Sequence, residues 1–545
     1  MKNGITKSTI LLSFLSIAQI ASAQTGGEGE SNILLLAIML AVVVVAFFLI
    51  IQVADNLMRI EAKNQGADGN DSNYSIFPAW SEIVRPKMAD YAIDKNVTVL
   101  KAGHDILLEG QAEKWDTAVN ANTFAVQPPN FLGISPIPKM EVAVGDSVVA
   151  GQVLFFDKKA PAIKHVAPVS GEIIAINRGQ KRSIAEVVIL ADKEQQYGTY
   201  PDFDIINSSR EELVDYLMEG GAWPFIRQRP FNTIPDPAVV PANIFISTFD
   251  TAPLAPDLNK VVEGKGEAFQ AGLDILRKLT SGKVHLGLNA GADEMPSAIF
   301  TEATGVEKHW FHGKHPAGNV GIQIHHIAPV DTNRIAWTLD VQAVITLGNI
   351  FVEKRFNAER VVVLTGAELH EPKYITTKIG ANIGDLLANN LKDGNNRIVS
   401  GDVLSGTQKT TAGFLNAFDD QVTVLEEGDY YEPFGWLLPL SPRPTISSTY
   451  PNGFFPDLRF KADTNTHGEK RAFVVTGQYE SVLPMDMYPQ QLMKAILIND
   501  FERMEGLGIY ELVEEDIALA EFACTSKQPL QKILRDGLNF MIEQG

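Results

Sequence analysis

A short stretch of the chain gathers aromatic and cationic side chains within nine residues: Trp223, Phe225, Arg227, Arg229 and Phe231. Aromatic faces can clasp a planar ring, and guanidinium groups can stack on rings and donate hydrogen bonds to carbonyl oxygens. The combination predicts a site for a planar, weakly polar ligand such as a quinone head. The alternative is an aromatic plug between domains, with the arginines at the surface. Residue types alone leave both interpretations open.

Four of the ten histidines fall within a second stretch: His312, His315, His325 and His326. The stretch from residue 311 to 326 contains no cysteine or carboxylate that would complete a typical zinc site. Glycines at 318 and 321 would allow a close approach of the backbone to a ligand or another strand. We therefore expect a conformationally demanding loop at an interface rather than a metal site. His315 joins the five residues above as a candidate quinone contact.

Other motifs of known chemistry are weak or absent. Gly287–Asp293 follows an expected strand but lacks the full glycine spacing of a dinucleotide-binding loop. The sequence has no Gly-x-x-x-x-Gly-Lys-Ser/Thr phosphate loop and no Gly-x-Ser-x-Gly elbow. We assign no catalytic, cofactor-binding or metal-binding residue to this chain.

The elements that must position these residues begin with a repeated β pattern. Val144–Leu154 and Ala167–Ile176 each place turn glycines among β-branched and aliphatic residues. Two such halves look like the β-sandwich of biotinyl and lipoyl carrier domains. Lys158 and Lys159 lie between the halves, where carrier domains present the modified lysine, but the biotin motif Met-Lys-Met is absent. An exposed hairpin tip is the alternative to modification.

Periodicity predicts the remaining elements. Helical spacing covers 210–218, 266–279, 491–501, 514–523 and 529–542, and buried strands are expected at 240–249, 284–288 and 359–365. We expect a multidomain α/β (α+β) protein with four folded parts. These are a barrel-sandwich domain at 97–192, an α/β domain at 193–354, a β-grasp-like domain at 355–440 and a mainly helical part at 441–545.

The N-terminal region has the pattern of membrane targeting. Residues 1–23 resemble a signal segment, and 33–53 form an apolar run long enough for a transmembrane helix. A polar linker is expected at 54–96. Positive residues after the run place the main body in the cytoplasm, whether or not the first segment is cleaved. The net charge of −20 argues against nucleic acid, and the single cysteine, Cys524, excludes an internal disulfide.

With these stretches in view, the chain resembles the A subunit of the sodium-translocating NADH:quinone oxidoreductase. The motifs that carry the resemblance run in order along the sequence. They include Val144-Gly-Asp, Gly151-Gln-Val-Leu-Phe-Phe-Asp-Lys-Lys159, Pro168-Val-Ser-Gly171, Arg227-x-Arg-Pro-Phe231, Lys314-His-Pro-Ala-Gly318, Ile398-Val-Ser-Gly401, Phe434-Gly-Trp436 and Pro484-Met-Asp-Met487. Residues 1–96 depart from the family, whose usual member starts near Val97.

The resemblance implies a cofactor-free member of a six-part complex in the bacterial inner membrane. It would contribute to the binding and reduction of ubiquinone or menaquinone, and would dock chiefly on the membrane-embedded B subunit. FMN, FAD, riboflavin, iron–sulfur centres and Na+ are expected in the B to F partners. The architecture is also similar to the flavoprotein of respiratory complex I that binds NADH. Where that protein has its glycine-rich FMN loop, this sequence reads Glu219-Gly-Gly-Ala-Trp-Pro-Phe.

Two alternatives remain at this point. A periplasmic membrane-fusion adaptor of an efflux system would also combine an anchor with a lipoyl-type domain. It would, however, insert a helical hairpin between the halves, where only residues 155–166 stand. An FMN-binding NADH dehydrogenase subunit is opposed by the bulky side chains in the loop after Gly221.

Overall fold

The computed structural model describes residues 39–43, 46–47, 50–51, 54, 89–116, 120–432, 434, 442–446, 457–473 and 477–544. The chain divides into two compact units, Met1–Met88 and Ala89–Gly545. The predicted signal segment and most of the predicted transmembrane helix and linker lie outside the described residues. Among those that are described, no helix combines the length and the apolar character needed to cross a bilayer.

The second unit contains a six-stranded sheet of order β1-β13-β12-β11-β14-β10. Neighbouring strands are parallel except for β10 and β14. The strands expected at 240–249 and 284–288 are confirmed as β11 and β12, whose continuous apolar runs suit a sheet covered on both faces. The bounds are β1 Val97–Val99, β10 Arg227–Arg229, β11 Asn243–Ser247, β12 Val284–Asn289, β13 Glu307–His312 and β14 Ala336–Thr338.

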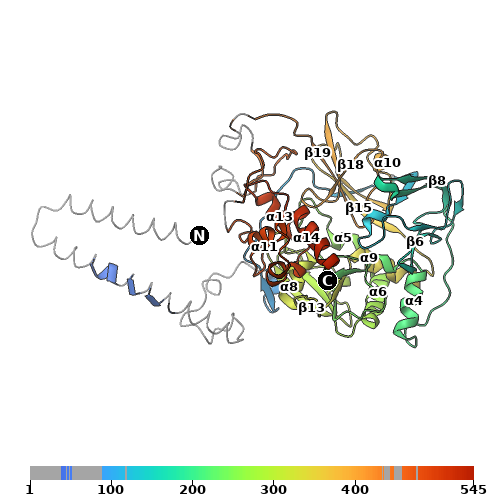
Figure 1. Cartoon of the computed structure of the whole chain (residues 1–545), viewed down its shortest axis with the longest axis horizontal. Coiled ribbons are helices and arrows are strands. Elements are labelled where there is room, and N and C mark those ends of the chain that lie inside the picture. The colour runs from blue at the N-terminus through green and yellow to red at the C-terminus, as the bar shows by residue number, and fades with distance from the viewer. Residues whose placement is uncertain are drawn as a thin grey trace, which may run out of the picture. The chain divides into compact units, whose positions relative to one another are not determined.

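Helices lie beside this sheet and against the neighbouring parts of the chain (Figure 1). They are α4 Arg210–Glu219, α5 Leu258–Val261, α6 Gly266–Leu279, α7 Ala298–Thr301, α8 Val320–Ile327 and α9 Val341–Val352. The expected helices at 210–218 and 266–279 are confirmed as α4 and α6. Ser209 starts α4 with a capping box, in which its side chain accepts from the Glu212 N–H. Helices α6 and α9 pack closely because Gly348 has no side chain: a Cβ there would lie 1.8 Å from the Ala268 carbonyl oxygen.

The predicted barrel-sandwich domain is present as two facing sheets, of order β3-β9-β8-β5 and β4-β6-β7. Gly145 and Gly151 both have positive φ, as the turn pattern predicts. Lys158 and Lys159 form the exposed tip of the β6–β7 hairpin. The bounds are β3 Thr123–Val126, β4 Lys139–Met140, β5 Ser147–Val148, β6 Val153–Asp157, β7 Ala160–Val166, β8 Gly171–Arg178 and β9 Ile184–Ala191.

A second six-stranded sheet, of order β18-β17-β19-β15-β16-β2, occupies the segment predicted to be β-grasp-like, and we keep that name for it. Its strands are β2 Lys114–Asp116, β15 Glu359–Thr365, β16 Lys373–Lys378, β17 Asn396–Ser400, β18 Thr407–Lys409 and β19 Gln421–Glu426, with the short helix α10 Ile383–Leu386. Strands β1 and β2 fall inside the predicted 97–192 segment, yet they pair with β13 and β16 of the other two sheets. Two strands of the predicted sandwich segment therefore belong to the sheets of the neighbouring parts. The domain boundaries themselves stay a prediction.

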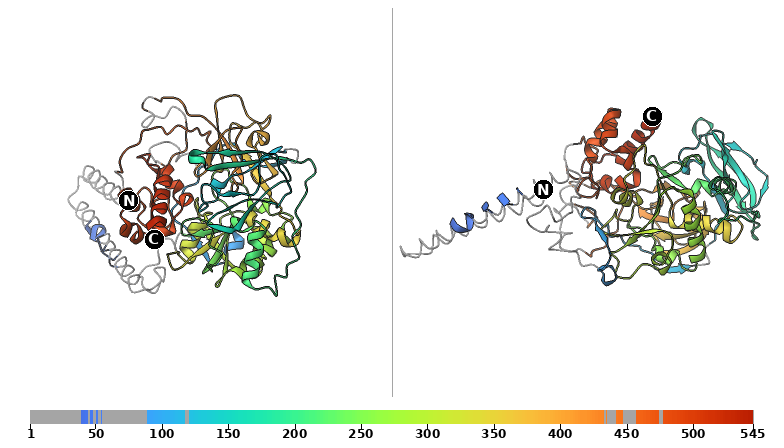
Figure 2. Two further views of the ribbon diagram at one scale, coloured as in Figure 1. Left: turned by 45° about the vertical axis from the view of Figure 1, so that its right-hand side comes forward. Right: turned by 90° about the horizontal axis from the view of Figure 1, so that it is seen from below.

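The C-terminal part has its own hydrophobic cluster, and its described α-helices begin at Pro489. Its helices are α11 Pro489–Leu497, α12 Phe501–Gly506, α13 Glu514–Ala523 and α14 Leu530–Gln544. The expected helices at 514–523 and 529–542 are confirmed as α13 and α14, whereas the single helix expected at 491–501 is wrong, because α11 ends at Leu497 and α12 starts at Phe501. Helix α11 approaches α14 at Gly537, where a Cβ would lie 2.8 Å from the Ile496 side chain. In Figure 1 and the right-hand panel of Figure 2, these helices and the barrel-sandwich lie on different sides of the α/β sheet. Five described 3-10 turns complete the unit: η2 Asp90–Ala92, η3 Pro128–Asn130, η4 Gln180–Arg182, η5 Trp223–Phe225 and η7 Ile509–Glu511.

Candidate functional site

The predicted ligand loop leaves helix α4 and enters strand β10. Gly221 stands at its start with a φ of 70°. A Cβ on Gly221 would lie 2.5 Å from the Val166 side chain of β7. The backbone conformation and the close approach both require glycine here. The loop is therefore held against the barrel-sandwich domain before its aromatic residues begin.

The first two aromatic residues of the loop lie in the hydrophobic core. Trp223 is 0% exposed; its indole N–H donates to the Pro235 carbonyl at 3.0 Å, and its ring meets Trp337 edge-on at 5.3 Å. Phe225 is 5% exposed and packs edge-on against Phe131. Trp223 thus has no face open to a ligand in this conformation, whereas Phe225 borders a small cavity.

Arg227 keeps one terminal nitrogen without a hydrogen-bond partner among the described residues. Its Nη2 donates to the Asn130 carbonyl at 2.7 Å, and its guanidinium carbon lies 3.7 Å from the centroid of the Phe418 ring. Nη1 is buried and bonds to no described protein group. Burial lowers the pKa of Arg227 to about 9, so the guanidinium stays charged at neutral pH. It could donate one further hydrogen bond.

Arg229, by contrast, pairs with acidic side chains through both terminal nitrogens, and only its buried Nε has no partner among the described residues. Its Nη1 lies 3.1 Å from Oδ2 of the buried Asp516, and its Nη2 lies 2.6 Å from Oε1 of Glu515. Burial disfavours the charge on Arg229, but Asp516 and Glu515 outweigh it and raise the pKa. The expectation of a surface arginine is wrong here, since Arg229 is 2% exposed. Its contacts tie β10 to the start of α13.

Phe231 also faces the C-terminal helices. Its ring meets Tyr510 edge-on at 5.7 Å, and its carbonyl accepts a hydrogen bond from Arg535 Nη1 at 3.0 Å. Phe231 has a φ of 80°, in the left-handed region that non-glycine residues rarely adopt. Contacts with the C-terminal helices hold this conformation.

His315 lies apart from the aromatic loop, beyond the end of β13. Its Nδ1 is 3.1 Å from Thr251 Oγ1, and its backbone N–H donates to Asp105 at 2.9 Å. Burial lowers its pKa, against the opposing effect of Asp402 and Asp105. The six predicted residues therefore divide among three surroundings: the core and its cavity, the contact with the C-terminal helical part, and the Thr251 loop.

A cavity of about 20 Å³ lies where the barrel-sandwich, α/β and β-grasp-like parts meet; we call it the junction cavity. Its lining consists of Ala125, Val126, Phe131, His165, Val166, Pro168, Gly221, Pro224, Phe225, Phe356, Ile379 and Ala417. His165 is not among the residues predicted from the sequence. The two-residue period of a strand could have indicated its burial, because Ile163 and His165 both point to the buried side of β7.

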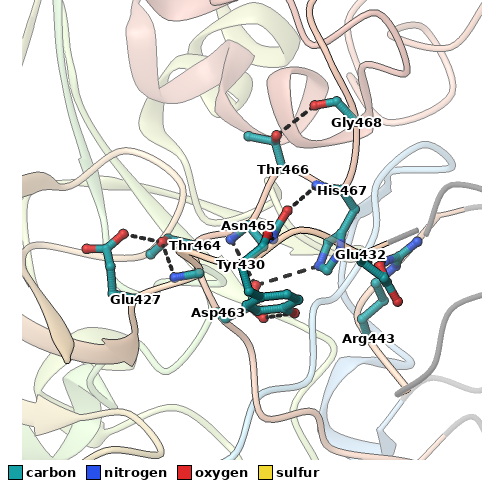
Figure 3. Close-up of polar contacts among 11 residues, drawn as sticks. Glu427, Tyr430, Glu432, Arg443, Asp463, Thr464, Asn465, Thr466, His467 and Gly468 are labelled. Carbon is teal, nitrogen blue, oxygen red and sulfur yellow. Dashed lines mark hydrogen bonds and ion pairs between the residues drawn. The ribbon is translucent and has the colours of Figure 1, made fainter. Parts of the chain in front are cut away.

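A polar cluster that was not predicted from the sequence lies beyond β19 (Figure 3). His467 Nδ1 lies 3.0 Å from Glu432 Oε2, which also accepts from Arg443 Nη1 at 2.8 Å. The Tyr430 hydroxyl donates to Asp463 at 2.6 Å, and this bond raises the pKa of Tyr430 to about 12. Asp463 Oδ1 also lies 3.6 Å from His467 Nε2. The cluster satisfies its own charges and fastens two separate stretches of chain together.

Two further histidines of the second stretch join α8 to the C-terminal part, whereas His312 ends β13 and its buried Nδ1 has no described partner. His325 Nδ1 lies 2.7 Å from Glu511 Oε2, and His326 Nε2 lies 2.8 Å from the Pro484 carbonyl oxygen. These contacts lie at an interface, but the expectation of a loop is wrong for this part of the stretch, because residues 320–326 belong to helix α8. Across the part of the chain that the structure describes, no three His, Cys, Asp or Glu side chains are grouped to hold a metal ion.

Comparison with known proteins matches three family models to this chain. They are described as the NqrA N-terminal barrel-sandwich hybrid domain over residues 98–192, the NqrA second alpha/beta domain over 208–356 and the NQRA C-terminal domain over 361–411. The matches follow the order of the sandwich, the α/β sheet and the β-grasp-like sheet.

Curated relatives are similar over most of their length. The chain is 40% identical to the A subunit of the Na(+)-translocating NADH-quinone reductase of Saccharophagus degradans, over 75% of this chain and 91% of the relative. For the proteins of the same name from Alcanivorax borkumensis and Neisseria meningitidis, identity is 37% and 39%. Coverage is 77% and 75% of this chain, and 94% and 91% of the relatives.

Among solved structures, two of an NAD+-reducing [NiFe]-hydrogenase match at 12% and 10% identity. They cover 43% and 64% of this chain, and 52% and 67% of the matched chains, at TM-scores of 0.30 and 0.31. Scores this low carry no argument about this chain.

Proposed function

Because this chain belongs to the NqrA family, the A subunit of the Na(+)-translocating NADH-quinone reductase, we propose that it contributes to quinone binding in such an oxidoreductase complex. The observation that carries the proposal is the junction cavity. Aromatic rings surround it, and two polar side chains near it, His165 and Arg227, keep ring or guanidinium nitrogens that bond to no group in the described part of the chain. Apolar walls with few polar groups are typical of small-molecule sites.

The surroundings of the six predicted residues suggest different roles in this proposal. Phe225 borders the cavity, and Arg227 has a free donor, so these two would face the ligand. Trp223, Arg229, Phe231 and His315 would hold the shape of the region, because their contacts are with other parts of the chain. A cavity of about 20 Å³ admits roughly one water molecule. A quinone ring therefore enters only when the junction widens.

We further propose that the chain docks on the membrane-embedded B subunit, and that partner subunits supply the flavins, the iron–sulfur centre and the sodium path. The segment after α4 favours a chain that binds no cofactor of its own. A phosphate group bound there would need backbone N–H groups with open space around them. Gly221 instead lies in contact distance of Val166, and Trp223 is in the core.

The proposed location is the bacterial inner membrane, with residues 33–53 as the anchor and the main body in the cytoplasm. This rests on the apolar run and on the basic residues that follow it, such as Arg59 and Lys63. The family assignment favours the reductase over the efflux-adaptor alternative, since the relatives are matched over about nine-tenths of their length.

Quinone binding can be tested on the purified full-length chain by equilibrium dialysis with a short-chain ubiquinone analogue. We expect saturable binding at one site, weakened in Phe225→Leu. Phe300→Leu is the matched control, because Phe300 is also buried and packs edge-on against Phe269, but does not line the cavity. Absence of saturable binding, or equal weakening by both variants, would overturn the proposal. Flavin absorbance at one equivalent per chain would instead support the FMN-binding alternative.

A further inference from the structure

His165 is a buried polar side chain whose hydrogen-bonding capacity is unused by the protein. The residue is 2% exposed, and neither ring nitrogen bonds to a described protein group. Its ring stacks on Phe155 at 4.7 Å and meets Phe131 edge-on at 4.6 Å, so packing fixes its orientation. A buried polar group without a partner costs about 1–3 kcal/mol. A buried group without a hydrogen-bond partner indicates a bound water or ligand, or needs another explanation.

The surroundings make His165 a neutral donor and acceptor. Burial, followed by the nearby charge of Arg227, lowers the pKa of His165 to about 3. At neutral pH the imidazole therefore carries one N–H group and one bare nitrogen. A neutral ring of this kind can donate to an oxygen atom or accept from a hydroxyl.

The junction cavity beside His165 is otherwise apolar. Among the side chains that line it, His165 alone is polar; the others are aromatic, aliphatic, proline or glycine. An ion has no countercharge on these walls and would lose its hydration. The lining therefore fits a neutral oxygen atom, either of water or at the edge of an apolar molecule.

We propose that His165 hydrogen bonds a neutral oxygen held in the junction cavity. In the closed conformation the volume suits the oxygen of one water molecule. When the junction widens, a carbonyl oxygen of the quinone head takes the same position; this second source rests on the proposed function. In both cases Phe131, Phe225 and Phe356 surround the oxygen with rings.

Two variants distinguish the loss of the His165 hydrogen bond from the effect of replacing any buried histidine. His165→Phe keeps a ring against Phe155 and removes both nitrogens. His285→Phe is the matched control: His285 stacks on Phe245 at 4.7 Å, but its nitrogens are used, by His309 at 2.9 Å and Asn243 at 3.1 Å. His285 does not line the cavity.

The first measurement is the affinity of each full-length variant for the short-chain ubiquinone analogue. We expect about a tenfold loss in His165→Phe, the effect of one neutral hydrogen bond, and no change in His285→Phe. If the unaltered chain and His165→Phe bind the quinone equally well, His165 does not hydrogen bond a quinone carbonyl oxygen. The proposed function would stand in that case. If the unaltered chain binds no quinone, the proposed function fails.

The second measurement does not depend on quinone. In a high-resolution crystal structure of the full-length chain without ligand, we expect density for one oxygen about 2.7–3.2 Å from a ring nitrogen of His165. Density in His285→Phe but not in His165→Phe would support the assignment. An empty cavity in the unaltered chain would overturn the water source.

Discussion

Replacing Arg229 with methionine tests whether this residue serves as a structural tie. Methionine has a similar length but cannot pair with Asp516, which is fully buried. The Asp516 carboxylate would then keep the Val513 N–H, at 3.0 Å, as its described donor. Breaking a buried ion pair by removing one partner costs about 3–5 kcal/mol. Glu515 adds little to this loss, because its side chain is 44% exposed and can be hydrated.

The assay is urea unfolding of the purified full-length chain, followed by far-ultraviolet circular dichroism. We expect Arg229→Met to lower the free energy of unfolding by about 3–5 kcal/mol. Arg334→Met is the matched control, because Arg334 is half exposed and lies 3.8 Å from Asp331; such surface pairs contribute about 0–1 kcal/mol. The double variant Arg229→Met/Asp516→Leu should recover much of the loss, because it leaves no buried charge.

A loss below about 1 kcal/mol in Arg229→Met, equal to that in Arg334→Met, would show that the buried ion pair does not stabilise the fold. It would mean that Asp516 is solvated or neutralised without Arg229. A loss that persists undiminished in the double variant would point to packing rather than charge as the cause. Either result would remove the ion pair as the tie between β10 and α13.

Two further predictions concern a buried acid and the glycine that starts the ligand loop. Burial, with Asp250 and Asp340, raises the pKa of Asp420 to about 8, whereas an unfolded Asp titrates near about 3.9. Between these values the folded chain binds the extra proton, so stability should fall as pH rises from about 4 to about 8. Asp420→Asn should flatten that fall in unfolding midpoints measured at pH 5 and pH 8; parallel slopes would contradict the assignment. Gly221→Ala should destabilise the chain more than Gly145→Ala, because both have positive φ but only Gly221 would clash, with Val166 at 2.5 Å. Equal melting temperatures would contradict the close packing.

Local patterns in the sequence predicted individual elements well. The apolar stripe of 266–279 gives α6 with the expected bounds, and the continuous run 359–365 gives β15. Gly145 and Gly151 form the turns that their positions indicate. These features depend on residues within one turn or one strand, so neighbours in the sequence contain the necessary information.

The candidate site was predicted less completely. Composition identified Phe225 and Arg227, which lie at or near the junction cavity, together with Trp223 and Arg229, whose contacts are internal. All four carry side chains suited to a ring ligand, so residue type could not separate them. What distinguishes these residues is their contact partners, several of which are distant in the sequence.

Residue order alone is enough to predict the kinds of element, the turn positions and the family motifs. The tertiary structure decided which polar groups are satisfied. Arg229 is neutralised by Asp516, 287 positions away, and β1 pairs with β13 rather than with the sandwich that follows it. His165 looks in the sequence like any strand residue, and only the packing of three domains leaves its nitrogens facing a cavity. Secondary structure follows from short-range sterics and periodicity, whereas charge pairing and cavities arise when distant surfaces are desolvated together.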